Sequence, residues 1–181
     1  MPHVCPWYLA YFFDNPFRRL FMKPEQLFAP YVRPGMAALD IGCGMGYNSI
    51  GLARLVAPEG RVIAVDLQQR MLNVLMKRAR RAGVAGYVEP HVCDPGDIGI
   101  NTPVDFACAF WVAHETPDAA ALLRQIRAVL RPGGHAFLAE PRGEVTETGF
   151  ARLLEMAGET GFDVVDRPHV AFSRAAVLRT A

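Results

Sequence analysis

The stretch LDIGCGMGYNSI, residues 39–50, joins the end of an apolar strand to a loop with glycine at every second position. Glycine permits a positive φ and lets the backbone approach a ligand with no Cβ in the way. In an open parallel sheet, ligands bind beyond the carboxyl ends of the strands. A helix predicted over 47–57 would then point its free N–H groups at the bound molecule. The stretch therefore predicts a ligand site at the end of this strand.

The spacing of the three glycines narrows the choice of ligand. Gly42, Gly44 and Gly46 give the pattern G-x-G-x-G, and the next position holds the bulky Tyr47. A dinucleotide-binding loop has G-x-G-x-x-G, and a phosphate-binding Walker loop ends in Gly-Lys-Ser or Gly-Lys-Thr. Neither pattern is present, so a ligand without a phosphate is favoured.

Strand-like and helical patterns alternate along most of the chain. The helices are predicted to stop at Gly83 and at Pro132-Gly133-Gly134. This alternation is typical of a parallel sheet with helices on both faces. The strands are expected at 36–41, 61–66, 87–92, 104–110 and 135–140.

The C-terminal part breaks the alternation. A helix is predicted around 146–158, and it is followed by the apolar runs FDVVD and HVAFSRAAVLRT with Arg167-Pro168 between them. Two strands this close in sequence must pair antiparallel. Because no linker or internal repeat interrupts the chain, one domain spanning 1–181 is predicted.

The totals exclude several classes of protein. The chain has 181 residues and a net charge of +1, which gives no support to a nucleic-acid or acidic-membrane partner. The four cysteines show no C-x-x-C spacing, no signal peptide is recognised and no apolar run reaches membrane-spanning length. We therefore expect a soluble cytoplasmic protein with reduced thiols and no metal site. The oligomeric state stays open, a homodimer included.

Acidic residues follow the first three predicted strands or end them. Asp66 ends the second strand, twenty residues past Gly46, where a carboxylate can accept both hydroxyls of a ribose. Cys93-Asp94-Pro95 follows the third strand, so Asp94 could accept a hydrogen bond from an adenine amine. One Asp at a strand end is as often a cap or turn residue. Together with Asp40, however, the aligned acids favour an adenosine-containing ligand.

Five segments together resemble the successive motifs of class I S-adenosylmethionine-dependent methyltransferases, and most closely those of the small type 11 group. The segments are ALDIGCGMGYNSI, VIAVDLQQRML, CDPGD, VDFACAFWVAHE and LRPGGHAFLAEP, and the likeness covers 34–181. It implies a three-layer, Rossmann-like α/β fold. The sheet would have seven strands in the order 3-2-1-4-5-7-6, with strand 7 antiparallel. It also implies an enzyme that binds S-adenosylmethionine and transfers its methyl group.

The resemblance also implies roles for individual residues around the cofactor. The glycines of the loop would wrap the methionine portion, and Asp40 would organise the loop near the amino group of the ligand. The other residues expected to bind the cofactor are Asp66 on the ribose, Leu67 on the adenine, Asp94 at the adenine amine with its neighbour Cys93, and the Phe110 carbonyl near the amino group.

The end of the fourth strand, AFWVAHE, should border the methyl group. Trp111 and His114 are the predicted acceptor-binding residues there, and Glu115 is a weaker candidate. The imidazole of His114 has a pKa suited to proton transfer near neutral pH, so His114 is the candidate catalytic base. The alternative is that His114 and Glu115 only cap the loop before the next helix.

The first 33 residues are expected to form an aromatic-rich helical cap. Seven aromatic residues fall within the fifteen positions 7–21. The cap either packs into the core or forms a lid over the acceptor pocket, with Tyr11 as a substrate-binding residue. A lid of this kind would exclude water and favour an apolar or planar acceptor.

The sequence thus predicts methyl transfer to a small molecule, because no extra domain or basic stripe remains to bind a macromolecule. Two alternatives stay open. A nicotinamide-dependent oxidoreductase is disfavoured by Tyr47 in place of a third fingerprint glycine. A cofactor-binding partner subunit without catalytic activity would use an exposed apolar patch, which the N-terminal aromatic residues could supply. The acceptor itself is not identified.

Overall fold

Seven strands form one sheet in the order β3-β2-β1-β4-β5-β7-β6 in the computed structural model, which describes residues 22–180. All neighbouring strands pair in parallel except β7, which runs antiparallel to both β5 and β6. The predicted strand order and the antiparallel seventh strand are therefore confirmed. The strands are β1 Ala37–Ile41, β2 Arg61–Asp66, β3 Val88–Val92, β4 Val104–Phe110, β5 Leu130–Pro141, β6 Phe162–Asp166 and β7 Ser173–Thr180.

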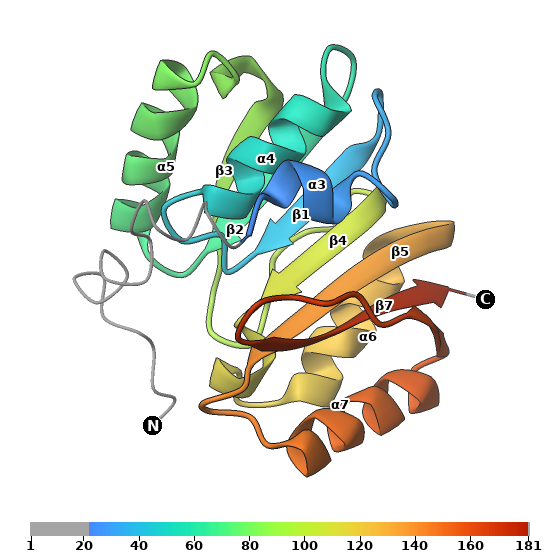
Figure 1. The fold of residues 1–181 in the computed structure, drawn as a ribbon. Coiled ribbons are helices and arrows are strands. Elements are labelled where there is room, and N and C mark those ends of the chain that lie inside the picture. The colour runs from blue at the N-terminus through green and yellow to red at the C-terminus, as the bar shows by residue number, and fades with distance from the viewer. Residues whose placement is uncertain (1–21, 181) are drawn as a thin grey trace.

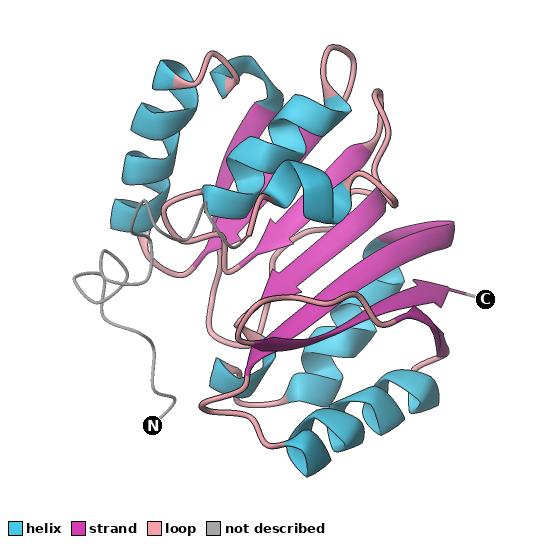
Figure 2. Ribbon diagram, viewed as in Figure 1, coloured by secondary structure: helices cyan, strands magenta, loops and turns pink. Residues whose placement is uncertain are grey.

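Helices cover both faces of the sheet (Figures 1 and 2). The first face carries α3 Pro24–Phe28, α4 Tyr47–Val56 and α5 Gln69–Arg81, and the second carries α6 Ala119–Val129 and α7 Glu147–Glu159. Because side chains alternate along a strand, β1 sends Ala38 to the first face and Leu39 to the second. All five residues of β1 are buried, as expected for a central strand of a sheet covered on both sides.

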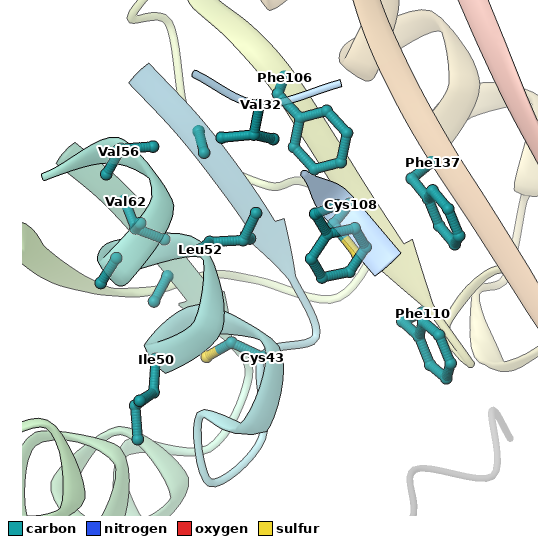
Figure 3. Close-up of a cluster of buried hydrophobic side chains, with 14 of the residues drawn as sticks. Val32, Cys43, Ile50, Leu52, Val56, Val62, Phe106, Cys108, Phe110 and Phe137 are labelled. Atoms are coloured by element: carbon teal, nitrogen blue, oxygen red, sulfur yellow. The ribbon is translucent and has the colours of Figure 1, made fainter. Parts of the chain in front are cut away.

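The core on the first face is built around aromatic contacts from distant segments (Figure 3). Phe28 of α3 is fully buried, and its ring centroid lies 5.6 Å from that of Phe106 and 5.2 Å from that of Phe137. Part of the predicted cap, 22–33, therefore packs into the core, where Val32 is buried as well. The aromatic run with Tyr11 lies outside the described residues, so its predicted role as a lid stays a prediction.

Most predicted elements agree with the observed bounds to within one residue, but β7 begins only at Ser173, inside the run HVAFSRAAVLRT, and β5 differs more. The strand was expected at 135–140 and begins instead at Leu130, directly after α6. Pro132-Gly133-Gly134, expected to end the helix, forms a bulge inside the strand. Val104 pairs with Leu130 while Phe106 pairs with His135, so β5 holds three residues more than β4 over this interval. Proline lacks the N–H needed for regular pairing, and Gly133 has a φ of 75°.

The connection between β3 and β4 contains no helix and is held in place by α6. The Gln125 side chain accepts a hydrogen bond from the Ile98 N–H at 2.8 Å and donates one to the Gly96 carbonyl at 2.7 Å. Ile98 is buried against the second face of the sheet. Two short 3-10 turns, η1 Ala85–Tyr87 and η2 Ala113–Glu115, complete the described elements. Within 22–180, no helix is both long and apolar enough to cross a membrane.

Candidate active site

One cavity of about 930 Å³ lies at the carboxyl ends of the parallel strands. The arrows of β1, β2 and β4 in Figure 1 point toward this side of the sheet. One end of the cavity is lined by the loops after β1, β2 and β3, and the other by the segments after β4 and β5 and by the loop before β7. We call these the cofactor end and the acceptor end.

The three glycines of the loop after β1 serve two different purposes. All have a positive φ, 64° at Gly42, 53° at Gly44 and 85° at Gly46. A Cβ at Gly42 would lie 2.3 Å from Val112 Cγ2, and one at Gly46 would lie 2.6 Å from Leu75 Cγ. A Cβ at Gly44 would meet no described atom within 4 Å. Gly42 and Gly46 therefore allow close packing against Val112 and Leu75, and Gly44, which lines the cavity, leaves its surface open.

Asp66 ties the tip of β2 to the glycine loop. Its Oδ2 accepts the Gly44 N–H at 2.9 Å, and its Oδ1 accepts the Gln68 N–H at 2.8 Å. Burial raises the pKa of this carboxyl, while the two backbone hydrogen bonds oppose the shift. An ionised carboxylate can accept about four hydrogen bonds, so each oxygen keeps capacity for a ligand hydroxyl. Asp66 and the half-exposed Leu67 both line the cavity.

Asp40 lies behind the loop and does not line the cavity. It is 1% exposed, and its Oδ2 accepts a hydrogen bond from the Ser49 hydroxyl in the first turn of α4. This bond joins β1 to the helix that follows the loop. Asp40 is thus placed to organise the loop through Ser49.

Asn48 is a cavity residue that the sequence analysis missed. It is 7% exposed, and its Oδ1 has no hydrogen-bond partner among the described residues. A buried amide oxygen without a donor is costly, about 1–3 kcal/mol. Since Asn48 lines the cavity, this oxygen is a candidate acceptor for a donor group on a ligand. Its place in the first turn of α4, two residues after Gly46, was the available signal.

Asp94, the acid after the third strand, and its neighbour Cys93 line the cofactor end of the cavity. Asp94 and Asp97 exchange backbone hydrogen bonds of 3.2 and 3.1 Å, which closes a tight turn after β3. Burial raises the pKa of the Cys93 thiol to about 11, and it raises the pKa of Cys43 as well. Both thiols are therefore neutral near pH 7, and neither is suited to act as a nucleophile.

Two aromatic residues with unusual backbone conformations line the acceptor end. Trp111 and Phe172 have φ values of 62° and 60°, which are uncommon for residues other than glycine and concentrate at functional sites. The Trp111 indole N–H donates to the Ser173 hydroxyl at 2.9 Å, and its backbone N–H donates to Ala139 at 2.7 Å. Arg142 donates to the carbonyls of Phe172 and Ser173 at 2.9 and 3.0 Å. The loops after β4 and β5 are thereby joined to the loop before β7.

His114 lies in η2, between two glutamates that the sequence analysis did not single out. Its Nδ1 is hydrogen-bonded to Oε2 of Glu140, and its Nε2 lies 3.3 Å from Oε2 of Glu144. Glu140 ends the buried part of β5 and is 1% exposed, and its Oε1 accepts the Ala113 N–H at 2.9 Å. The hydrogen bond to Glu140 and the nearby carboxylates raise the pKa of His114, although burial opposes them. In the sequence, the feature that could have pointed to Glu140 was an acidic residue at the end of an apolar strand.

The predicted site residues fall into three groups. Tyr11 lies outside the described part of the chain. Asp40 and Gly46 are not among the residues that line the cavity. The residues that line the cavity are Gly42, Gly44, Asp66, Leu67, Cys93, Asp94, Phe110, Trp111 and His114. Their individual roles in binding and chemistry stay predictions.

Comparison with known proteins identifies the family. Residues 38–134 match the family described as "Methyltransferase domain". The chain belongs to the class I methyltransferase family. S-adenosylmethionine is therefore its cofactor, and the resemblance of the five motifs to the class I family is confirmed, while the narrower type 11 group stays a prediction.

Two curated relatives and one solved structure illustrate the similarity of this methyltransferase to known proteins. The 2-phytyl-1,4-naphtoquinone methyltransferase of Synechococcus elongatus is 33% identical over 105 residues, 58% of this chain and 45% of that protein. The demethylmenaquinone methyltransferase of Lactobacillus johnsonii is 30% identical over 147 residues, 79% of this chain and 58% of that protein. The chain spans about half the length of both relatives.

The solved structure supports the fold. A crystal structure of a SAM-dependent methyltransferase from Aquifex aeolicus matches with a TM-score of 0.87 and 20% identity. The match covers 98% of this chain and 100% of the other chain, so the two chains share the fold.

Proposed function

We propose that this protein transfers a methyl group from S-adenosylmethionine to a small, apolar or planar acceptor. The observation that carries the proposal is the single cavity that joins the glycine loop and Asp66 at one end to Trp111 and His114 at the other. Small-molecule sites span about 300–1,000 Å³. At about 930 Å³, this cavity has room for a cofactor together with a second small molecule.

The cofactor end fits an adenosyl ligand with an amino-acid tail. The open surface at Gly44 admits close approach of a ligand, and Asp66 keeps acceptor capacity for ribose hydroxyls. The buried Oδ1 of Asn48 offers an acceptor for an ammonium group. Leu67 supplies apolar surface for adenine, with Cys93 and Asp94 at its edge. None of these residues at the cofactor end calls for a phosphate group on the ligand.

The chemistry divides between the cofactor and the protein. S-adenosylmethionine supplies a methyl group on a sulfonium, which is already reactive toward a nucleophile in line with the carbon–sulfur bond. The protein then needs to hold the acceptor in line and exclude water, and such positioning can contribute several kcal/mol. In this proposal, Trp111 and Phe172 are the aromatic wall that holds the acceptor, and His114 is the base that takes its proton; the lining of the cavity and the hydrogen bond between His114 and Glu140 support these roles.

The nature of the acceptor is inferred from the acceptor end and from the relatives. Aromatic side chains line this end, and they favour planar or apolar molecules through area burial and ring stacking. The two curated relatives carry names that refer to quinones, which are planar and apolar. A net charge of +1 gives no broad basic field for a nucleic acid, so a small molecule is preferred to a macromolecule.

Isothermal titration with S-adenosylmethionine, S-adenosylhomocysteine and NADH tests the cofactor. Micromolar affinity for both adenosyl ligands and no heat with NADH is the expected result. Transfer of labelled methyl to 1,4-naphthalenediol then tests the acceptor class. Cofactor binding without transfer to any apolar ring compound would favour a non-catalytic partner subunit. Binding of NADH alone would overturn the proposal.

A further inference from the structure

His114 lies between two carboxylates, one buried and one exposed. Glu140 is 1% exposed and fixed at the end of β5, whereas the Glu144 side chain is 62% exposed at the cavity rim. A third carboxylate, Glu115, lies beside His114 on the same turn and adds to the local negative charge. The imidazole therefore has one permanent partner and one that a ligand could displace.

Glu140 decides which ring nitrogen of His114 carries the proton. Its Oε1 is engaged by the Ala113 N–H at 2.9 Å, so the carboxylate cannot turn away from the imidazole without leaving that donor unpaired. When the Glu140 carboxylate is ionised it can only accept hydrogen bonds, and Nδ1 of His114 then donates to Oε2. A neutral His114 then has its free lone pair on Nε2.

Nε2 of His114 is also the atom that meets Glu144, at 3.3 Å. This contact is attractive only when Nε2 carries a proton, because two acceptors would otherwise face each other. Glu144 thus stabilises the imidazolium, whereas in the neutral ring no attraction remains between Nε2 and the Glu144 carboxylate. Since Glu144 is largely exposed, a proton that reaches it can pass on to water.

We propose that Glu140 is a positioning residue that makes Nε2 of His114 a base for a neutral, protic acceptor, and that Glu144 conducts the proton to solvent. The inference rests on the proposed methyl transfer. An acceptor O–H gives its proton to Nε2, the oxygen electron pair forms the bond to the methyl carbon, and the carbon–sulfur pair stays on sulfur. Three surrounding carboxylates repel an acceptor that is already anionic. The acceptor class is therefore a phenol, hydroquinone or enol, and a carboxylate is excluded.

Titration of the His114 ring by NMR tests the positioning role without any acceptor. His114 signals are assigned with His114→Gln, and ring titration and nitrogen shifts are compared in the wild type, Glu140→Gln, Glu144→Gln and Glu155→Gln. Glu155 is an exposed carboxylate on α7 and serves as the matched control. We expect the pKa of His114 to fall most in Glu140→Gln, less in Glu144→Gln and not at all in the control. The neutral ring should be protonated at Nδ1 in the wild type and mixed in Glu140→Gln.

An unchanged pKa of His114 in Glu140→Gln, or a neutral wild-type ring protonated at Nε2, would overturn the positioning role.

Activity assays test the acceptor class. Methyl transfer to 1,4-naphthalenediol but not to 1-naphthoate is expected. In Glu140→Gln, kcat should be at least ~10-fold lower, and the rising limb of its pH profile should move to lower pH. Transfer to the naphthoate, or to neither probe, overturns the acceptor class. Titration calorimetry with S-adenosylmethionine separates the two proposals. If the wild type does not bind S-adenosylmethionine, the proposed function fails. If Glu140→Gln still binds it but turns over more slowly, the loss of turnover is due to the impaired base His114.

Discussion

At the cofactor end of the cavity, the Asp66 side chain accepts hydrogen bonds from backbone N–H groups, whereas at the acceptor end side chains are hydrogen-bonded to other side chains. Asp66 accepts N–H groups from Gly44 and Gln68, which lie 22 and 2 residues away. Trp111, by contrast, is joined to Ser173 across 62 residues, and His114 to Glu140 across 26. Because the cofactor is common to the family, we expect specificity for the methyl acceptor to be determined at the acceptor end.

This difference leads to separate expectations for the two ends. A change at the cofactor end should abolish ligand binding, while a change at the acceptor end should leave binding intact and lower turnover. If both ends responded in the same way to substitution, the division of the cavity would be wrong.

Asp66→Ala is expected to have the largest effect. In the proposed complex it removes the acceptor for two ribose hydroxyls, and it also leaves the Gly44 and Gln68 N–H groups without their Asp66 partner. Charge-assisted hydrogen bonds contribute about 1.5–3 kcal/mol each, so affinity for S-adenosylmethionine should fall about 1,000-fold. Titration calorimetry gives the affinity, and Asp163→Ala at an exposed position on β6 is the control. Unchanged affinity in Asp66→Ala would show that the ribose lies elsewhere.

His114→Ala should separate turnover from binding at the acceptor end. General base catalysis contributes about 100-fold or more, so kcat with 1,4-naphthalenediol should fall by about that factor. Affinity for S-adenosylmethionine should stay within a few-fold of the wild type, because His114 contacts glutamates outside the glycine loop. Steady-state kinetics and calorimetry on the same preparation check both values. A turnover within a few-fold of the wild type would rule out the base.

Gly46→Ala and Gly44→Ala form a matched pair that tests the two purposes of the glycine loop. Both introduce a Cβ at positive φ, which costs about 1–2 kcal/mol. At Gly46 the Cβ also meets Leu75 at 2.6 Å, so the free energy of unfolding should fall by about 2 kcal/mol or more. At Gly44 it meets no described atom, and the loss should stay near 1 kcal/mol. Urea denaturation without cofactor measures both, and an equal loss would contradict the assignment.

The sequence was informative where function depends on local chain order. The alternation of strands and helices predicted a parallel sheet covered on both faces, and the glycine spacing together with Asp66 favoured an adenosine ligand without a phosphate. The strand order and S-adenosylmethionine itself were implied by the resemblance of the five motifs to the class I family. The bulge in β5 was missed because Pro132-Gly133-Gly134 is equally suited to end a helix and to interrupt a strand. Only pairing with β4 distinguishes the two.

The side-chain contacts at the acceptor end could not be predicted from local sequence patterns. Glu140 is an ordinary acid at a strand end until β4 and β5 pair and place it against Nδ1 of His114. Ser173 becomes a partner of Trp111 only when β7 inserts antiparallel next to β5. Such contacts depend on strand order across the sheet, which no local pattern contains. His114 itself was found because its residue type suggests proton transfer at neutral pH.

Ser173→Ala should have a smaller effect, confined to the acceptor end. It removes the acceptor for the Trp111 indole N–H at 2.9 Å and leaves that donor partly buried. Such a loss costs about 1 kcal/mol, which should appear as a modest decrease in the free energy of unfolding. Because Trp111 lines the acceptor end, KM for 1,4-naphthalenediol should rise more than the Kd for S-adenosylmethionine. Equal changes in the two constants would mean that Ser173 supports the whole cavity.

The smallest effect is expected in the pH dependence of stability, and it follows from the pKa of His114. The unfolded imidazole titrates near 6.5, and in the fold its pKa is raised, chiefly by the hydrogen bond to Glu140. Folding therefore favours the protonated ring, so this contribution is complete below about pH 6.5 and is lost as pH rises through the folded pKa. The change cannot exceed about 1.4 kcal/mol per pH unit, because one proton is involved.

His135 acts in the opposite direction, because burial lowers its pKa. Its neutral form is favoured in the fold, so its contribution is lost as pH falls below about 6.5. The two histidines are separated by comparing urea denaturation of the wild type and His114→Gln between pH 6 and pH 9. The difference in unfolding free energy between the two proteins should shrink as pH rises, and it should vary far less with pH in a Glu140→Gln background. A constant difference at every pH would mean that Glu140 does not hold the imidazolium, and the acceptor end would then lack its permanent partner for His114.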